Sequence, residues 1–145
     1  MSEYDLDDDS GRVDFDAVWA FLSTEPYWGT WRTREQLAAQ IASAWRVVGA
    51  YHRETGAQVG FARAISDGVA FAYLSDVYVL PSARGHGLGK ALVRTMIDEG
   101  PGADFRWNLH TLDAHGLYRP FGFAEPDAKL LERPSRIPGS QLPPS

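Results

Sequence analysis

The sequence VLPSARGHGLGKALV, residues Val79–Val93, passes from a β-rich segment through three alternating glycines into an amphipathic helix. Glycine lets the backbone turn sharply and bring several N–H groups close to a ligand. The N-terminal end of the following helix adds about half a positive charge. The stretch therefore predicts a site for a pyrophosphate or a similar phosphorylated group.

The glycine spacing distinguishes between three known types of phosphate-binding loop. A Walker loop requires Gly, four residues and Gly-Lys-Ser/Thr, whereas here Arg84 stands at the first glycine position and Ala91 follows Lys90. The dinucleotide fingerprint requires a third glycine where Lys90 stands. Arg-x-x-Gly-x-Gly fits, as Arg84, Gly87 and Gly89, and resembles the acetyl-CoA signature of the GCN5-related N-acetyltransferases (GNAT). The alternative is a glycine-rich turn that caps an ordinary helix.

A second motif lies in TLDAHGLYRPFGF, residues Thr111–Phe123. It is similar to the C-terminal signature of the same family, in which a tyrosine precedes a Gly-Phe pair after a short helix. With the segment Ala72–Val79, the resemblance covers residues 13–133. Within the family the chain is most similar to a group of small, uncharacterised bacterial acetyltransferases. That group has a Tyr-Trp pair near the start, here Tyr27-Trp28, and Asp-Ala-His-Gly-Leu-Tyr near the end.

Length and charge predict one domain between two tails. The chain has 145 residues, of which 44% are hydrophobic, so we expect one globular core. The first ten residues hold five acids and no base, so the net charge of −5 belongs to this segment. We expect an acidic, disordered tail over 1–12, a single domain over 13–133 and a proline-rich, disordered tail over 134–145. No basic field suited to nucleic acid is present.

The sequence also bears on location and on reaction class. No apolar run approaches the ~20 residues that cross a bilayer, and the first residues do not form a basic-then-apolar leader, so we expect a cytoplasmic protein without a membrane partner. The absence of cysteine excludes disulfides, thiolate zinc sites and a cysteine acyl-enzyme. The four histidines show no metal-ligand spacing, so we expect no metal.

Hydrophobic periodicity predicts alternating helices and strands. We expect a helix over 13–22, capped by Asp14 or Asp16, and a second helix after a capping box of Thr33 and Gln36. Later elements are a helix from Leu88 that Gly100-Pro101-Gly102 ends, a strand through Phe105–Leu109, a short helix over Asp113–Tyr118 and a last strand over Lys129–Arg133. Three antiparallel strands precede them, over Val47–His52, Ala57–Ile65 and Val69–Leu80, with Asp67-Gly68 as a type I′ turn.

The strand before the glycine loop carries an acid on an apolar face. Strict alternation puts Ala72, Leu74, Asp76 and Tyr78 on the same face. Burying a carboxylate there costs free energy unless the group has a functional role or is paired. Asp76 is therefore the first candidate for a general base or for an anchor of the acceptor's ammonium group. A hydrogen bond to a neighbouring loop is the alternative.

The resemblance implies an α/β fold whose mixed, mostly antiparallel central sheet is flanked by helices, with splayed fourth and fifth strands that admit the pantetheine arm of acetyl-CoA. It implies that Tyr118 acts as general acid or hydrogen-bond donor near the sulfur; the alternative is an aromatic residue that packs a helix. A backbone N–H near Val79 would stabilise the oxyanion. The cofactor-binding residues that it implies are Tyr78, Val79 and Leu80 along the arm, and Arg84, Gly85, His86, Gly87, Leu88, Gly89 and Lys90 at the pyrophosphate.

An amine must lose a proton before it attacks a thioester, and imidazole titrates near neutral pH. His115 precedes Tyr118 by one helical turn, so it is a candidate catalytic residue in the same cleft. His110 is expected on a strand face opposite Trp107 and Leu109.

The acceptor site is expected to involve Tyr27, Trp28, Tyr73 and Asp76. Aromatic rings beside a carboxylate favour a cation with apolar or aromatic bulk; the alternative is that the loop aromatics plug the edge of the core. We therefore expect an N-acetyltransferase that moves the acetyl group of acetyl-CoA directly to a primary amine of a small molecule or peptide, on a fold that often pairs into homodimers. The alternatives are a catalytically idle acyl-CoA sensor and a protein-interaction domain that uses the acidic leader.

Overall fold

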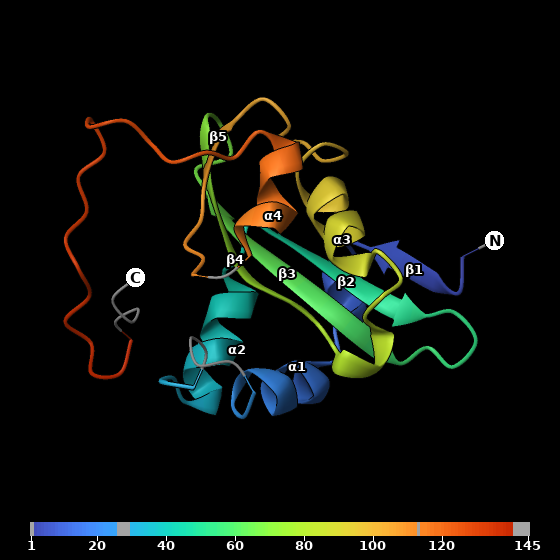
Figure 1. Ribbon diagram of the computed structural model, residues 1–145. Coiled ribbons are helices and arrows are strands. Elements are labelled where there is room, and N and C mark those ends of the chain that lie inside the picture. The colour runs from blue at the N-terminus through green and yellow to red at the C-terminus, as the bar shows by residue number, and fades with distance from the viewer. Residues whose placement is uncertain (1, 26–29, 113, 141–145) are drawn as a thin grey trace.

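The computed structural model describes residues 2–25, 30–112 and 114–140 (Figure 1). The strands of this part of the chain are β1 (Tyr4–Asp7), β2 (Arg46–His52), β3 (Gln58–Ser66), β4 (Phe71–Val79) and β5 (Arg106–Asn108). The α-helices are α1 (Phe15–Leu22), α2 (Arg34–Ala42), α3 (Leu88–Met96) and α4 (His115–Tyr118). Asp14 caps α1, and the capping box of Thr33 and Gln36 at α2 is confirmed.

The strands form one sheet in the order β1-β2-β3-β4-β5. Neighbouring strands are antiparallel except for β4 and β5, which are parallel. The helices α3 and α4 lie on one side of the sheet, and α1 and α2 lie on the other (Figure 1). The predicted fold class, a mixed and mostly antiparallel sheet flanked by helices, is confirmed.

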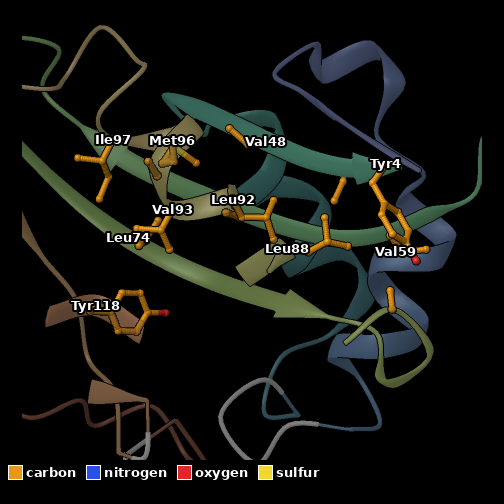
Figure 2. Close-up of a cluster of buried hydrophobic side chains, with 14 residues drawn as sticks. Tyr4, Val48, Val59, Leu74, Leu88, Leu92, Val93, Met96, Ile97 and Tyr118 are labelled. Carbon is orange, nitrogen blue, oxygen red and sulfur yellow. The ribbon is translucent and has the colours of Figure 1, made fainter. Parts of the chain in front are cut away.

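A hydrophobic core fills each side of the sheet. On the α3 side, Leu88, Leu92, Val93 and Met96 share one helical face and pack on β2, β3 and β4 (Figure 2). On the other side, the buried residues of α1, α2 and the sheet form a second cluster, which comprises Val18, Phe21, Leu22, Leu37, Val47, Phe61 and Tyr78. The two cores fix the ends of β4 and α3, between which the glycine loop runs.

The acidic N-terminal segment belongs to the sheet. Its strand β1 pairs with β2, and Tyr4 is buried against the α3 core while Leu6 packs on its margin. The two acids of β1 are paired, since Arg53 contacts Asp5 at 2.8 Å and Arg12 contacts Asp7 at 3.2 Å. The prediction of a disordered tail over residues 1–12 is therefore wrong for residues 4–12.

Two other expectations about secondary structure are also wrong. The connection between β3 and β4 has four residues, 67–70, and the side chain of Asp67 accepts hydrogen bonds from the backbone N–H groups of residues 69, 70 and 71, so it is not a type I′ turn. The segment Lys129–Arg133 is not a strand in the structure. Pro134, Ser135 and Ser140, expected in a disordered tail, instead line the cavity described below.

A β-bulge interrupts β4 at Asp76. Phe61 pairs with Tyr78 and Arg63 pairs with Ser75, so one more residue lies between the two pairs on β4 than on β3. Asp76 has a φ of 56°, in the left-handed region. Beyond the bulge the alternation reverses: Leu74 packs in the α3 core, but Tyr78 packs in the opposite core. The prediction that both share one face is wrong.

Candidate active site

The glycine loop presents backbone N–H groups at the start of α3. Gly85 and Gly87 have φ values of 86° and 74°, which only glycine adopts readily. A Cβ atom built on either residue meets nothing within 4 Å, so the loop surface is open there. The first intrahelical bond runs from Ala91 to Gly87, so the N–H groups of residues 88–90 precede it. The expected pyrophosphate site fits this backbone.

An open strand edge continues from the loop. The strands β4 and β5 pair only from Phe71 to Tyr73 on β4, and within the described residues no strand pairs with the same edge farther along. The expected splay is confirmed. A cavity of about 1210 Å³ lies at this edge. It extends from Arg84 and Gly89 at the loop, past Val79, to Tyr118 on α4.

Three of the expected cofactor-binding residues also make contacts within the fold. Leu88 is 5% exposed and packs in the α3 core, so its backbone alone can face the loop. Tyr78 stacks on Phe21 with ring centroids 4.1 Å apart, and burial raises the pKa of its phenol. Arg84 donates from Nε to the carbonyl of Val79 at 3.1 Å, which holds the loop against the end of β4.

The remaining loop residues are placed as follows. Leu80 packs at the margin of both cores, while His86 and Lys90 are exposed. The His86 ring lies 5.4 Å from the ring of Tyr4 on β1. The structure thus ties the expected pyrophosphate loop to the first strand.

Tyr118 lies where α4 meets the cavity. Its side chain is 8% exposed, and its ring meets Phe123 edge-on at a centroid distance of 5.8 Å. In Figure 2, Tyr118 lies at the border of the α3 core, apart from the aliphatic side chains around the helix. Tyr118 thus packs in the core and also lines the cavity.

Asp76 lies in a buried ionic cluster. Arg32 donates from Nη2 to Oδ1 at 2.6 Å and from Nη1 to Oδ2 at 2.9 Å, a bidentate pair. Arg63 donates from Nε to Oδ2 at 2.8 Å. The three side chains are 2–5% exposed. Gln40 on α2 accepts a further bond from Arg32 at 2.7 Å.

This pairing changes the role of Asp76. Burial opposes its charged form, but the hydrogen bonds from Arg32 and the charges of Arg63 and Arg32 outweigh burial and hold the pKa of Asp76 below its usual value. Both carboxylate oxygens are already acceptors. This pairing argues against the predicted role of Asp76 as a general base or as an anchor of the substrate ammonium, and the bonds from Arg32 match the alternative, a hydrogen bond to a neighbouring loop.

His115 is not brought to the cavity. It is exposed at the start of α4, its Nε2 lies 3.3 Å from the carbonyl of Thr111, and it is not among the residues that line the cavity. The cavity wall instead includes His110, just after β5. The choice of His115 over His110 from the sequence is therefore wrong on position.

Tyr73, expected in the acceptor site, lines the cavity and hydrogen-bonds His110. The other ring nitrogen of His110 contacts the carboxylate of Glu132. Burial, followed by the charge of Glu132, raises the pKa of Tyr73. Tyr27 and Trp28, the other expected acceptor residues, lie outside the described residues.

Two searches of the described residues bear on ions and membranes. Within residues 2–25, 30–112 and 114–140, no three His, Cys, Asp or Glu side chains gather as metal ligands. None of the helices in these ranges combines the length and the apolar character of a membrane span.

Comparison with known proteins shows the family to which this fold and cavity belong. The family model of the acetyltransferase (GNAT) family matches residues 15–123. A crystal structure from Xanthomonas campestris pv. campestris, assigned to the GNAT family, is 33% identical with a TM-score of 0.87, over 97% of this chain and 99% of that one. A Deinococcus radiodurans structure, 23% identical with a TM-score of 0.72 over 99% and 96% of the chains, shares the fold.

Curated relatives match over shorter regions. A Gibberella zeae protein assigned as an acetyltransferase is 34% identical over 60% of this chain and 47% of its own length. Serotonin N-acetyltransferase 2, chloroplastic, of Oryza sativa subsp. japonica is 41% identical over 50% and 38%. The matched regions span about half or less of these relatives. The chain belongs to the GNAT family of acetyltransferases, as its two motifs predicted.

Proposed function

We propose that this chain is an acetyl-CoA-dependent N-acetyltransferase that acetylates a primary amine of a small molecule or peptide. The observation that supports this most is one continuous cavity, which connects the N-terminus of α3 with the open edge of β4 and with Tyr118. The name of the rice relative, a serotonin N-acetyltransferase, supports an amine as acceptor. We also propose the cytoplasmic location that the sequence led us to expect.

The residues divide the task by position. The backbone N–H groups from Gly85 to Lys90 would hold the pyrophosphate, since a helix N-terminus favours an anion. Arg84 keeps the loop in place through Val79. The unpaired edge of β4 offers main-chain groups to the amides of the pantetheine arm. Bound acetyl-CoA supplies the activated acyl group, and Tyr118 would donate a hydrogen bond or a proton at the sulfur.

Calorimetric titration with acetyl-CoA tests the binding part of the proposal. We compare wild type with Gly87→Val and with Gly56→Val, because both glycines have φ near 75° and open space at the Cβ position, but Gly56 lies in the β2–β3 turn and not in the glycine loop. Both variants suffer the same backbone strain. Acetyl-CoA binding should be lost in Gly87→Val and kept in Gly56→Val. Equal binding by both variants would contradict the loop assignment.

Release of CoA thiol with a panel of primary amines tests the catalytic part. The panel includes serotonin, other arylalkylamines, polyamines, amino acids and a peptide. CoA release that depends on the amine, with an acetylated product seen by mass spectrometry, is the expected result. Tight binding of acetyl-CoA without release for any amine would favour the sensor, and no binding at all would favour the interaction domain.

A further inference from the structure

Three polar side chains form a line in the wall of the cavity. They come from separate parts of the chain: Tyr73 from β4, His110 from just after β5, and Glu132 from the C-terminal segment. The Tyr73 hydroxyl hydrogen-bonds Nδ1 of His110, and Nε2 of His110 contacts a carboxylate oxygen of Glu132. The parallel ladder ends at the pair Tyr73 and Asn108, so the line stands where the strands begin to separate.

The partners of His110 determine where its proton lies. An ionised carboxylate only accepts hydrogen bonds, so Glu132 selects the tautomer with the proton on Nε2. Nδ1 then carries a lone pair and accepts the Tyr73 hydroxyl. Burial and the charge of Glu132 raise the pKa of Tyr73, so this phenol keeps its proton and donates it. The three residues repeat the logic of a catalytic triad: an acid orients an imidazole, which polarises a hydroxyl.

We propose that Tyr73, His110 and Glu132 form the proton relay that deprotonates the acceptor's ammonium group. The proposal rests on the proposed function and specifies its acceptor as an amine that arrives protonated. One N–H bond of the ammonium group breaks as its proton passes to the Tyr73 oxygen, and the Tyr73 proton passes to Nδ1 of His110. The products are a neutral amine and an imidazolium paired with Glu132, so charge and protons balance. His110 is 40% exposed, which lets solvent take the proton afterwards.

The surroundings favour this relay over the other polar groups of the cavity. Asp76 is committed to two arginines, and Tyr118 is assigned to the leaving sulfur. The charged groups that face the relay are Glu132 with its neighbour Arg133 on the C-terminal segment, and Arg63 with Asp76 across β3 and β4. Arg63 and Asp76 pair with each other, whereas Glu132 contacts Nε2 of His110 directly and so can stabilise an imidazolium there.

The test compares His110→Gln with His115→Gln as matched control, since His115 is exposed and lies outside the cavity wall. For an amine that wild type acetylates, kcat/KM is measured from about pH 6 to about pH 9.5. His110→Gln should lose about 10²-fold at neutral pH. The deficit should shrink as pH rises, because alkaline solution supplies the neutral amine without a base. Tyr73→Phe should show the same profile, and His115→Gln should match wild type.

Each outcome decides a separate point. A deficit in His110→Gln that is constant with pH would mean a structural role, and an unchanged kcat/KM would remove His110 from the reaction; both overturn the relay while leaving amine acetylation intact. If wild type acetylates no amine, the proposed function fails and the relay with it. Independently of activity, long-range ¹⁵N–¹H NMR should find the proton of the neutral His110 ring on Nε2 in wild type and a mixture of tautomers in Glu132→Gln. A proton on Nδ1 in wild type would overturn the relay.

Discussion

Replacing Asp76 by Asn should destabilise the fold strongly, because Asp76 is the anion that two buried guanidinium groups share. Arg32 and Arg63 donate three hydrogen bonds to it, and the side chains of the cluster are 2–5% exposed. The cluster holds two positive charges and one negative charge. Asp76→Asn therefore leaves two buried cations with a single amide oxygen between them. Removing one partner of a buried ion pair costs about 3–5 kcal/mol.

Urea unfolding followed by far-ultraviolet circular dichroism measures this loss. With an unfolding slope of about 2 kcal/mol per molar urea, the midpoint should fall by about 2 M. Arg32→Met is the informative second variant, because it removes one cation and leaves the pair of Asp76 and Arg63 neutral. Its midpoint should fall by less than that of Asp76→Asn.

Asp127→Asn is the control for loss of a carboxylate as such. Asp127 pairs with Lys129 at 2.8 Å, but the two side chains are 63% and 89% exposed, so no measurable change is expected. The reasoning is refuted if the midpoint of Asp76→Asn stays within about 0.3 M of wild type. It is also refuted if Arg32→Met costs more than Asp76→Asn, since the surplus positive charge would then not govern the cluster.

Acidification should also weaken the fold: the folded-state pKa of Asp76 lies below its ordinary value of 3.8, so its contribution is complete above that value and is lost as pH falls through the folded-state pKa. Acid unfolding should therefore be shallower in Asp76→Asn than in wild type. Tyr118→Phe keeps the ring contact with Phe123 but removes the hydroxyl group. The rate of thiol release should fall about 10²-fold, while calorimetry should give an unchanged affinity for acetyl-CoA. Full activity of this variant would contradict the role of Tyr118 as general acid. Deletion of residues 2–9 removes β1 and exposes the edge of β2, so the midpoint of thermal unfolding should fall by several degrees. An unchanged midpoint would instead support the disordered tail that the sequence predicted.

Elements with explicit local chemistry could be predicted from the sequence. The capping box of α2 and the glycine run before α3 are short-range signals, and both occur in the structure where the residues place them. The helix after the glycine loop is amphipathic, as predicted, and its apolar residues Leu88, Leu92, Val93 and Met96 are buried. Two motifs in the right order were enough to predict the family.

The first strand was missed because charge hid its pattern. Tyr4 and Leu6 alternate with Asp5 and Asp7, which is the period of a half-buried strand. The high content of acidic residues in the first ten positions instead suggested a disordered segment. The arginines that neutralise Asp5 lie at positions 12 and 53, so the pairing that stabilises β1 appears only after folding.

The candidate site was harder to predict because its partners are distant in sequence. Arg32 and Asp76 are separated by 44 residues, and His110 and Glu132 by 22. Neither pair leaves a local pattern. An unexplained acid on an apolar strand face did signal a buried partner, but it did not distinguish an arginine of the fold from an amine of the substrate. The sequence analysis placed Glu132 in a predicted strand over Lys129–Arg133, which the structure does not contain.

The bulge at Asp76 connects these observations. A regular strand would carry Asp76 and Leu74 on one face, which would put a carboxylate into the α3 core. The extra residue turns Asp76 to the opposite face, where Arg63 meets it and where it holds the loop that carries Arg32. The same shift leaves Val77 and Val79 against the α3 core along the open edge of β4. Because Arg32 and Arg63 bind the Asp76 carboxylate within the fold, the proposed relay assigns removal of the substrate proton to Tyr73 and His110, which line the same cavity.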